Sequence, residues 1–286
     1  MDKNFRFAWA IAFLLLTIAF ASVAGGRASL RSHVEMSMLV AGSLDIEADG
    51  RVSAHRIDRA EQMPAAVRQL VDSTVSGWRF EPVLVDGKPT PVRTSATLRV
   101  VAKPQGDGGY LLSLGGASFN RRSGQEGSEV TAADMRPPKY PPDAYNRGIK
   151  GTVYVILKIG REGSVLDAAA EQVNLTGIRD ASQAQRGRDW LADATVRQAR
   201  RWRFKPPSAG AEVDKPFWLL RIPVAYYFRD DKEPAYGSWE AYVRGPKLRP
   251  AWIDDAAAES ASDALIAGGV YPVGEGPKLL TPLTQG

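Results

Sequence analysis

The 286-residue chain contains no cysteine and only two histidines, His33 and His55. Without cysteine it can form neither a disulfide framework nor a thiolate metal site. The two histidines are not within ligand spacing of each other, so a histidine metal site or a catalytic triad has no support. Phosphate-binding and dinucleotide-binding glycine motifs are also missing. The sequence therefore predicts no catalytic residue, no metal ion and no cofactor, and the protein is not expected to be an enzyme.

A concentrated charge of one sign is missing too. Lysine and arginine total 37 against 32 aspartate and glutamate, which gives a net charge of +5. Because the two signs are interspersed along the chain and no long basic run occurs, the charge pattern does not favour nucleic acid as a partner.

One long apolar run is present, at the N-terminus. Lys3 and Arg6 precede residues 7–24, which are apolar apart from Thr17 and Ser22. Such a segment is typical of export, either as a cleaved signal peptide or as an uncleaved helix that anchors the chain in the inner membrane. Because no second run of spanning length follows, both alternatives predict that the rest of the chain lies outside the cytoplasm.

The string Trp-Arg-Phe-x-Pro occurs twice, at residues 78–82 and 202–206. The pattern around it repeats as well, which indicates an internal repeat. Each copy follows an alternating apolar stretch with a glycine turn, at Gly50 or Gly163, that is typical of a β-hairpin. The predicted structural signature of the repeat comprises Trp78, Phe80, Pro82, Gly163, Trp202, Phe204 and Pro206.

A helix is predicted between each hairpin and its Trp-Arg-Phe-x-Pro string. The tryptophan closes the apolar face of that helix, because Val67, Leu70, Val71, Thr74 and Trp78 have the same spacing as Leu191, Ala194, Thr195, Gln198 and Trp202. A strand is predicted after each proline, at residues 90–101 and 217–228. The expected fold class is therefore α+β, with two units of strand-strand-helix-strand in which one helix covers a three-stranded antiparallel sheet.

The last of these strands carries the predicted binding surface. Pro223 has no N–H group, so this strand is expected at a sheet edge with Pro223 facing outward. A long apolar edge is either covered by the chain itself or paired with a partner. We expect pairing with an extended peptide, and covering by the C-terminal tail is the alternative. The predicted peptide-binding residues are Phe217, Trp218, Leu220, Arg221, Ile222, Pro223, Val224 and Tyr226.

Residues 137–228 resemble the C-terminal domain of TonB energy transducers. The resemblance is carried by Tyr140-Pro141, Gly151, Gly163 and the second Trp-Arg-Phe-x-Pro string. It implies a periplasmic domain whose last strand binds a peptide segment of an outer-membrane TonB-dependent receptor. It further implies that a proton-driven inner-membrane motor acts through the N-terminal helix to power nutrient uptake. Residues 42–101 look like a degenerate copy without the Tyr-Pro start.

The predicted domain organisation has five parts. Residues 230–286 form a C-terminal extension, expected to pack irregularly along the second unit with a short helix near residues 254–266. An alternative to energy transduction is an envelope scaffold whose units pack on each other or form a homodimer. The remaining boundaries are 1–24 for the signal peptide or anchor, 36–119 for the degenerate unit, 120–134 for the linker and 135–229 for the TonB-like domain.

Overall fold

A computed structural model describes residues 34–105, 108–120, 126–178, 181–231, 234–253 and 263–283. The apolar run 7–24, His33 and most of the helix expected at 254–266 lie outside the described residues. The described residues form a mixed α and β structure, mostly strands, with three α-helices. None of the helices in this described part is long and apolar enough to cross a membrane.

The N-terminal half contains one helix and a four-stranded part of the sheet. Strand β1 pairs with β2 on one side and with β5 along most of its length, and β6 extends the sheet beyond β5. The elements of this half are β1 (Val34–Ile46), β2 (Val52–Ile57), η1 (Ala60–Gln62), α2 (Ala65–Val75), β3 (Leu84–Val85), β4 (Lys88–Pro89), β5 (Val92–Pro104) and β6 (Tyr110–Asn120).

The second half repeats the order of hairpin, helix and strand. Strand β8 lies between β9 and β11, and α4 packs on β8 and β9. The elements of this half are β7 (Thr131–Asp134), α3 (Pro142–Asn146), β8 (Lys150–Gly160), β9 (Val165–Gly177), η2 (Ala181–Gln183), α4 (Ala184–Ala199), β10 (Arg203–Lys205) and β11 (Phe217–Tyr226).

The C-terminal segment, residues 234–253 and 263–283, adds the strands β12 (Glu240–Val243) and β13 (Tyr271–Pro272). Strand β12 pairs with β9 on one side and with β1 on the other. The two expected three-stranded sheets are therefore joined into one nine-stranded sheet, in the order β13-β11-β8-β9-β12-β1-β5-β6 with β2 on β1. The segment pairs with strands in both halves, instead of packing irregularly along the second alone.

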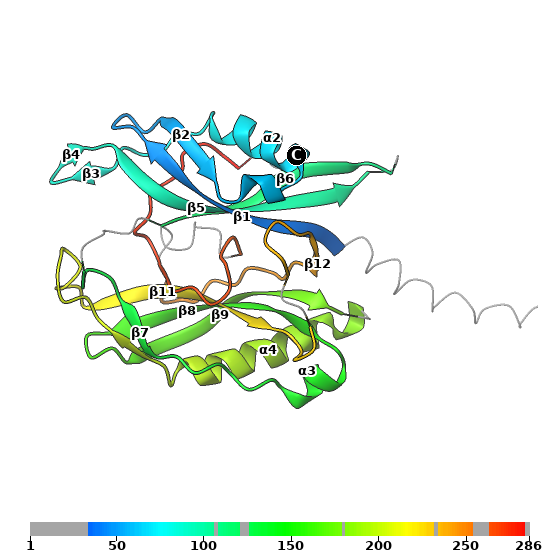
Figure 1. Cartoon of the computed structure of the whole chain (residues 1–286). Helices are drawn as coiled ribbons and strands as arrows, with labels where there is room; N and C mark the ends of the chain where they lie inside the picture. The colour runs from blue at the N-terminus through cyan, green and yellow to red at the C-terminus, as the bar shows by residue number, and fades with distance from the viewer. Residues whose placement is uncertain are drawn as a thin grey trace, which may run out of the picture.

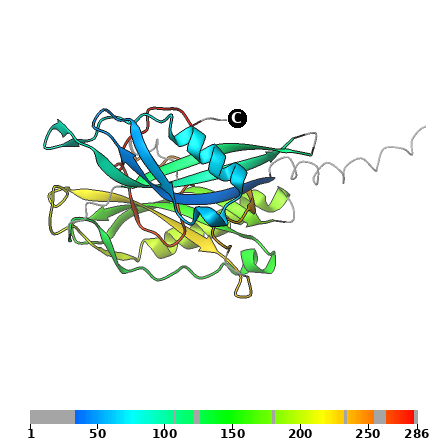
Figure 2. The same ribbon diagram turned by 45° about the horizontal axis from the view of Figure 1, so that its top comes forward.

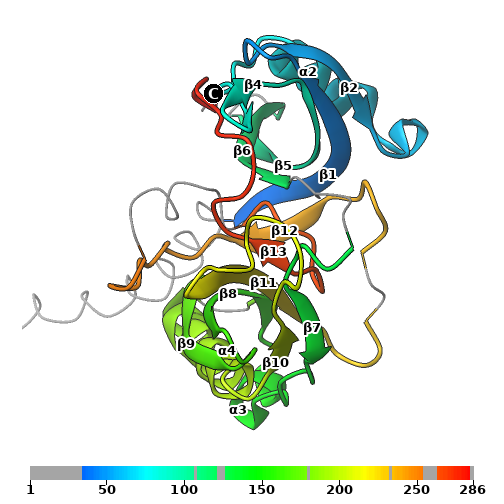
Figure 3. The same cartoon turned by 90° about the vertical axis from the view of Figure 1, so that its left-hand side faces the viewer.

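The halves lie one above the other, with their helices on opposite outer faces (Figure 1). Helix α2 runs across the outer face of the upper sheet (Figure 2), and α4 covers the outer face of the lower one. Figure 3 shows β12 and β13 between the two halves. The inner faces of both halves of this sheet are thus covered by the C-terminal segment, which forms a middle layer of the molecule.

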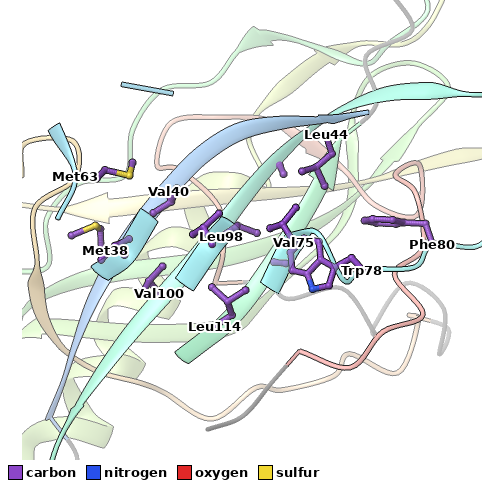
Figure 4. Packing of buried hydrophobic residues seen from close by; sticks show 14 of the residues in the cluster. Met38, Val40, Leu44, Met63, Val75, Trp78, Phe80, Leu98, Val100 and Leu114 are labelled. Atoms are coloured by element: carbon purple, nitrogen blue, oxygen red, sulfur yellow. The ribbon is translucent and has the colours of Figure 1, made fainter. Parts of the chain in front are cut away.

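Each helix buries an apolar stripe against its sheet. In α2 the buried residues are Val67, Val71 and Val75, which recur every four residues and so share one helix face. Just after the helix, Trp78 and Phe80 are each 1% exposed. Figure 4 shows Trp78 among the apolar side chains of the first core. In the second half, Trp202 and Phe204 are buried in the same way beneath α4.

The turn glycine and the phenylalanine of each repeat make the same contact. The Phe80 N–H donates to the Gly50 carbonyl at 2.8 Å, and the Phe204 N–H donates to the Gly163 carbonyl at 2.9 Å. Both glycines have positive φ, 83° and 75°. A Cβ at Gly163 would lie 1.9 Å from the Phe204 carbonyl oxygen. Only glycine therefore fits between the hairpin turn and the strand after the helix.

We expect Gly163→Ala to be strongly destabilising because it combines the positive φ with this backbone collision. Gly87→Ala is the matched control, since Gly87 has φ 76° but no atom within 4 Å of an added Cβ. The control is expected to lower the free energy of unfolding by about 1–2 kcal/mol, the cost of a left-handed conformation. Gly163→Ala should cost at least twice as much in urea unfolding. Equal costs would contradict the assigned contact.

Candidate functional site

Strand β11 uses one edge for the sheet and presents the other to the C-terminal segment. It pairs with β8 along its whole length, from Phe217 opposite Gly160 to Tyr226 opposite Gly151. On its other edge, the Pro223 carbonyl accepts a hydrogen bond from the Gly268 N–H at 3.2 Å. The N and O atoms of a strand residue point the same way, so the proline nitrogen also points away from β8. Pro223 therefore removes no hydrogen bond from the β8 pairing.

The outer edge of β11 carries a short strand of the protein's own chain. Strand β13 pairs antiparallel with it, with Pro272 opposite Leu220 and Tyr271 opposite Arg221. The Val273 N–H donates to the Leu219 carbonyl at 2.9 Å. These are two residue pairs, against ten on the β8 side. The edge therefore accepts an extended segment in this structure, over a small part of its length.

The side chains of the predicted binding residues divide between two faces. Trp218, Leu220, Ile222, Val224 and Tyr226 point toward α4 and belong to its cores. The Trp218 indole N–H donates to the Glu212 carbonyl, and the Tyr226 hydroxyl contacts Thr195. These five side chains are thus occupied inside the fold, and the outward backbone groups of β11 belong to the residues that alternate with them, such as Leu219 and Pro223. The other predicted residues, Phe217, Arg221 and Pro223, alternate with them on the opposite face of β11.

A buried ion pair lies under the middle of β11. The Arg221 guanidinium donates to both carboxylate oxygens of Glu171, at 2.6 and 3.0 Å, and both side chains are at most 4% exposed. Burial and the nearby Arg221 charge lower the pKa of Lys247, which lies in the C-terminal segment. The bidentate geometry fixes the position of Arg221, and thereby the centre of the strand.

A second buried polar cluster anchors the C-terminal segment at Asp263, whose side chain is fully buried. Its carboxylate lies 2.9 Å from the Arg244 guanidinium and accepts from Gln172 and Asn174 at 3.2 and 3.3 Å. The Arg99 guanidinium donates to the Asp263 backbone carbonyl at 2.7 Å. Strands β5 and β9 and the C-terminal segment are held together here. None of these five residues was predicted from the sequence.

A further anchor lies near the end of the C-terminal segment. The Leu280 N–H donates to the Arg79 carbonyl at 2.8 Å, and the Arg79 N–H donates to the Thr281 hydroxyl at 2.8 Å. Leu279 thereby forms an antiparallel bridge with Phe80 in the first half. In the second half, Ala132 of β7 pairs antiparallel with the equivalent Phe204. The C-terminal segment thus takes, in the first half, the place that β7 takes in the second.

The remaining signature residues support the start of the second half. The Tyr140 hydroxyl donates to the Ile149 carbonyl at 2.6 Å, and its ring packs edge-on against Tyr226. Pro141 precedes α3. Gly151 lies so close to Asn174 that a Cβ would come within 2.2 Å of its carbonyl oxygen. The prolines of the repeated string, Pro82 and Pro206, are exposed and half-buried respectively.

A carboxylate pair lies where the C-terminal segment passes the loop before β11. Burial and the charge of Glu212 raise the pKa of Glu275 from 4.5 to about 7. The positive charge of Lys215, which pairs with Glu212, opposes the shift, and Glu129 adds to it. The folded protein therefore holds the proton on Glu275 more tightly than the unfolded chain does.

We expect the stabilisation from protonated Glu275 to be complete below about pH 4.5 and to be lost as the pH rises through about 7. Hydrogen exchange of the Val273 amide should therefore become faster between pH 5 and pH 8, after correction for intrinsic exchange. Glu275→Gln should remove this dependence, because the neutral amide keeps the shape of the protonated acid. An unchanged pH profile in that variant would contradict the prediction.

Metal-binding groups were also considered. Among the described residues, no group of three or more histidine, cysteine, aspartate or glutamate side chains could hold a metal ion. The features that remain are therefore the outer edge of β11 and the buried clusters that position it.

Known proteins that are similar to this chain cover about a third of its length. No protein-family model matches the chain. Protein TonB from two strains of Xanthomonas campestris pv. campestris is 29% identical over 98 residues, which is 34% of this chain and 38% of each relative. The match thus spans well under half the length of these relatives.

Among solved structures, the solution NMR structure of the Pseudomonas aeruginosa TonB C-terminal domain aligns with 37% of this chain and 92% of its own length. The sequence identity is 22% and the TM-score is 0.26. The sequence relatives show that this chain is similar to protein TonB over the third of its length that they match.

Proposed function

We propose that the protein is an exported TonB-type protein that binds an extended peptide segment of an outer-membrane receptor along the outer edge of β11. The observation that carries the proposal is the pairing of β13 with this edge, in which Val273 and Gly268 donate to the carbonyls of Leu219 and Pro223. A strand edge that accepts its own chain in this way has the backbone geometry that β-augmentation needs.

The strands that follow the two Trp-Arg-Phe-x-Pro strings, β5 and β11, differ in how fully their outer edges are paired. This difference favours β11, in the second half, as the peptide-binding strand. In the first half, β5 follows Trp-Arg-Phe-x-Pro as β11 does, and its outer edge is paired with β6 over ten residue pairs. In the second half, β13 pairs with only two residues of β11. We propose that residues 36–119 and 135–229 are two TonB-like units, and that the second alone exchanges peptides.

The wider role follows the family. We propose that the protein acts in the periplasm, that residues 7–24 anchor it in the inner membrane, and that a proton-driven motor complex acts through this anchor during nutrient uptake. Determining the N-terminal residue of the mature protein tests the anchor, because a cleaved product cannot transmit force from the membrane.

Peptide backbone chemistry tests the proposed binding without altering the protein. Synthetic N-terminal peptides of outer-membrane receptors are titrated against the full chain by fluorescence anisotropy. N-methylation of the peptide amides that face β11 should weaken binding at least about tenfold, because each loses a backbone hydrogen bond and gains a clash. N-methylation of the alternate amides, which point away, is the matched control and should have little effect. Equal losses in both series would exclude strand pairing.

A second candidate is an envelope scaffold without energy transduction. It is favoured by β12, which pairs with a strand of each half and so connects their sheets. Light scattering tests it: a stable homodimer that binds none of the receptor peptides would support the scaffold, and a monomer that binds them would support the peptide-binding role.

A further inference from the structure

We propose that residues 266–276, the resident segment, occupy the outer edge of β11 as an exchangeable strand that an incoming extended peptide displaces. The inference rests on the proposed function, because it concerns the same edge. It adds that the protein carries its own competitor, which lowers the apparent affinity for every peptide that binds there.

The pairing between the resident segment and β11 is short. Its strand β13 pairs with two residues of β11. Besides this two-residue ladder, the Gly268 and Val273 N–H groups donate to carbonyls of β11. The Tyr271 hydroxyl instead contacts the backbone of Ile266 at 3.0 and 3.2 Å, inside the segment itself. The segment therefore keeps part of its own structure when it leaves the edge.

Both ends of the segment, in contrast, are firmly anchored. On one side Asp263 is buried in the polar cluster between the two sheets. On the other side Leu280 and Thr281 bond to the backbone and side-chain groups around Arg79. Exchange can therefore be local: the segment lifts from β11 while both anchors stay in place, and it remains close enough to return when the peptide dissociates.

The segment has backbone positions that permit such a movement. Gly268 and Gly274 flank β13 with φ of 81° and 84°, and neither has an atom within 4 Å of an added Cβ. These positions tolerate large changes in φ and ψ without collisions. They lie on either side of the two paired residues, as expected for hinges of a strand that leaves and returns.

The resident segment also indicates what the edge accepts. The residues from Ile266 to Gly274 carry no charge, and the pairing is antiparallel to β11. Because Val273 directs its N–H toward Leu219, the preceding Pro272 directs its nitrogen away from β11. A competing partner is thus an uncharged, extended peptide that runs antiparallel to β11 and tolerates proline at the outward-facing position.

A peptide that copies the segment tests exchange directly. The probe is a fluorescein-labelled peptide of residues 266–275, titrated against the full chain. Val273→Pro removes the N–H that bonds to Leu219, so it should open the edge and raise the affinity for the probe about tenfold, as expected when a mostly closed site becomes mostly open. Thr90→Pro is the matched control, because it removes a backbone bond of equal length, from Thr90 to the Val83 carbonyl, in the first half and away from the resident segment, and it should leave probe binding unchanged.

A reversible disulfide that holds the resident segment on β11 should prevent probe binding. The chain has no cysteine, so the double variant Leu219→Cys/Val273→Cys forms a single disulfide between residues that lie across from each other. The oxidised protein should not bind the probe, and reduction should restore binding. Equal binding before and after reduction would overturn the proposal, as would a Val273→Pro variant that binds no more tightly than the parent or a Thr90→Pro variant that opens the edge equally.

The experiments on strand exchange can fail or succeed independently of those that test receptor-peptide binding. The probe is the chain's own sequence, so exchange can be established even if no receptor peptide binds. Conversely, receptor peptides that bind the oxidised and reduced double variant equally, at an N-methylation-sensitive edge, would overturn exchange and leave peptide binding itself intact.

Discussion

Asp263→Ala is expected to lower the free energy of unfolding by about 3–5 kcal/mol, the usual cost of removing one partner from a buried ionic cluster. The carboxylate is fully buried beside Arg244 and also accepts from Gln172 and Asn174. Its removal leaves the buried Arg99 guanidinium, 3.8 Å away, without this counter-charge and the Gln172 and Asn174 amides without their acceptor. Urea unfolding followed by tryptophan fluorescence measures the loss.

Asp263→Asn is the matched control for this prediction. It keeps the shape and one acceptor oxygen but removes the charge, so its cost should be intermediate. The Asp263 backbone carbonyl, which accepts from Arg99, is unaffected in both variants. If Asp263→Ala cost less than about 1 kcal/mol, the typical net value of one neutral hydrogen bond, the anchoring role of the cluster would be wrong.

Glu171→Ala is expected to cost a similar amount, about 3–5 kcal/mol, because Arg221 stays buried after losing its carboxylate partner. The pair is bidentate and nearly fully enclosed. Since Arg221 lies at the centre of β11, the variant should also loosen the outer edge, which hydrogen exchange of the β11 amides would detect. Urea unfolding measures the stability.

The double variant Glu171→Leu/Arg221→Met separates the charge pair from the packing of the strand. Two apolar side chains of similar volume remove both charges, and such replacements are often neutral or stabilising. The double variant should therefore recover most of the stability lost in Glu171→Ala. A double variant as unstable as the single one would mean that Glu171 acts through contacts other than this ion pair.

Local patterns account for what the sequence could predict of the fold. The helical spacing that ends in Trp78 and Trp202 depends on residues within one or two turns of each other, and so does the glycine turn of each hairpin. The α-helix α2 (Ala65–Val75) and the strands on either side of it follow from such patterns. The outward direction of Pro223 follows from one chemical property, its missing N–H group.

The middle layer could not be predicted in this way because its contacts join distant parts of the chain. Asp263 meets Asn174 and Arg99, which are 89 and 164 residues away. No periodicity connects such positions. A signal is present in β9, where the polar residues Glu171, Gln172 and Asn174 lie close together among apolar residues and are all buried. Polar residues clustered in a central strand indicate a buried polar partner, although they do not identify it.

The structure also changes which part of β11 is available to a partner. The sequence singled out the side chains of β11, but Trp218, Leu220 and Ile222 are buried in the core beneath α4. What the strand offers to a partner is its outward backbone at Leu219, Arg221 and Pro223. Because side chains alternate along a strand, half of them face the core, and the backbone groups that point outward belong to the residues of the other half.

Covering of the edge by the chain itself and binding of a peptide were alternatives at the level of sequence. The structure places β13 on the edge, but over two residue pairs and between two glycines. A short resident strand is compatible with both alternatives, since it protects the edge from aggregation and leaves it open to exchange.

Backbone NMR of the isotopically labelled full chain during titration with receptor N-terminal peptides tests the central claim, binding at the outer edge of β11, most directly. The account predicts shifts in the amide signals of residues 217–226 and 266–276, with the signals of β6 unchanged. Shifts confined to other parts of the protein, or none at peptide concentrations that saturate an established TonB C-terminal domain, would contradict it.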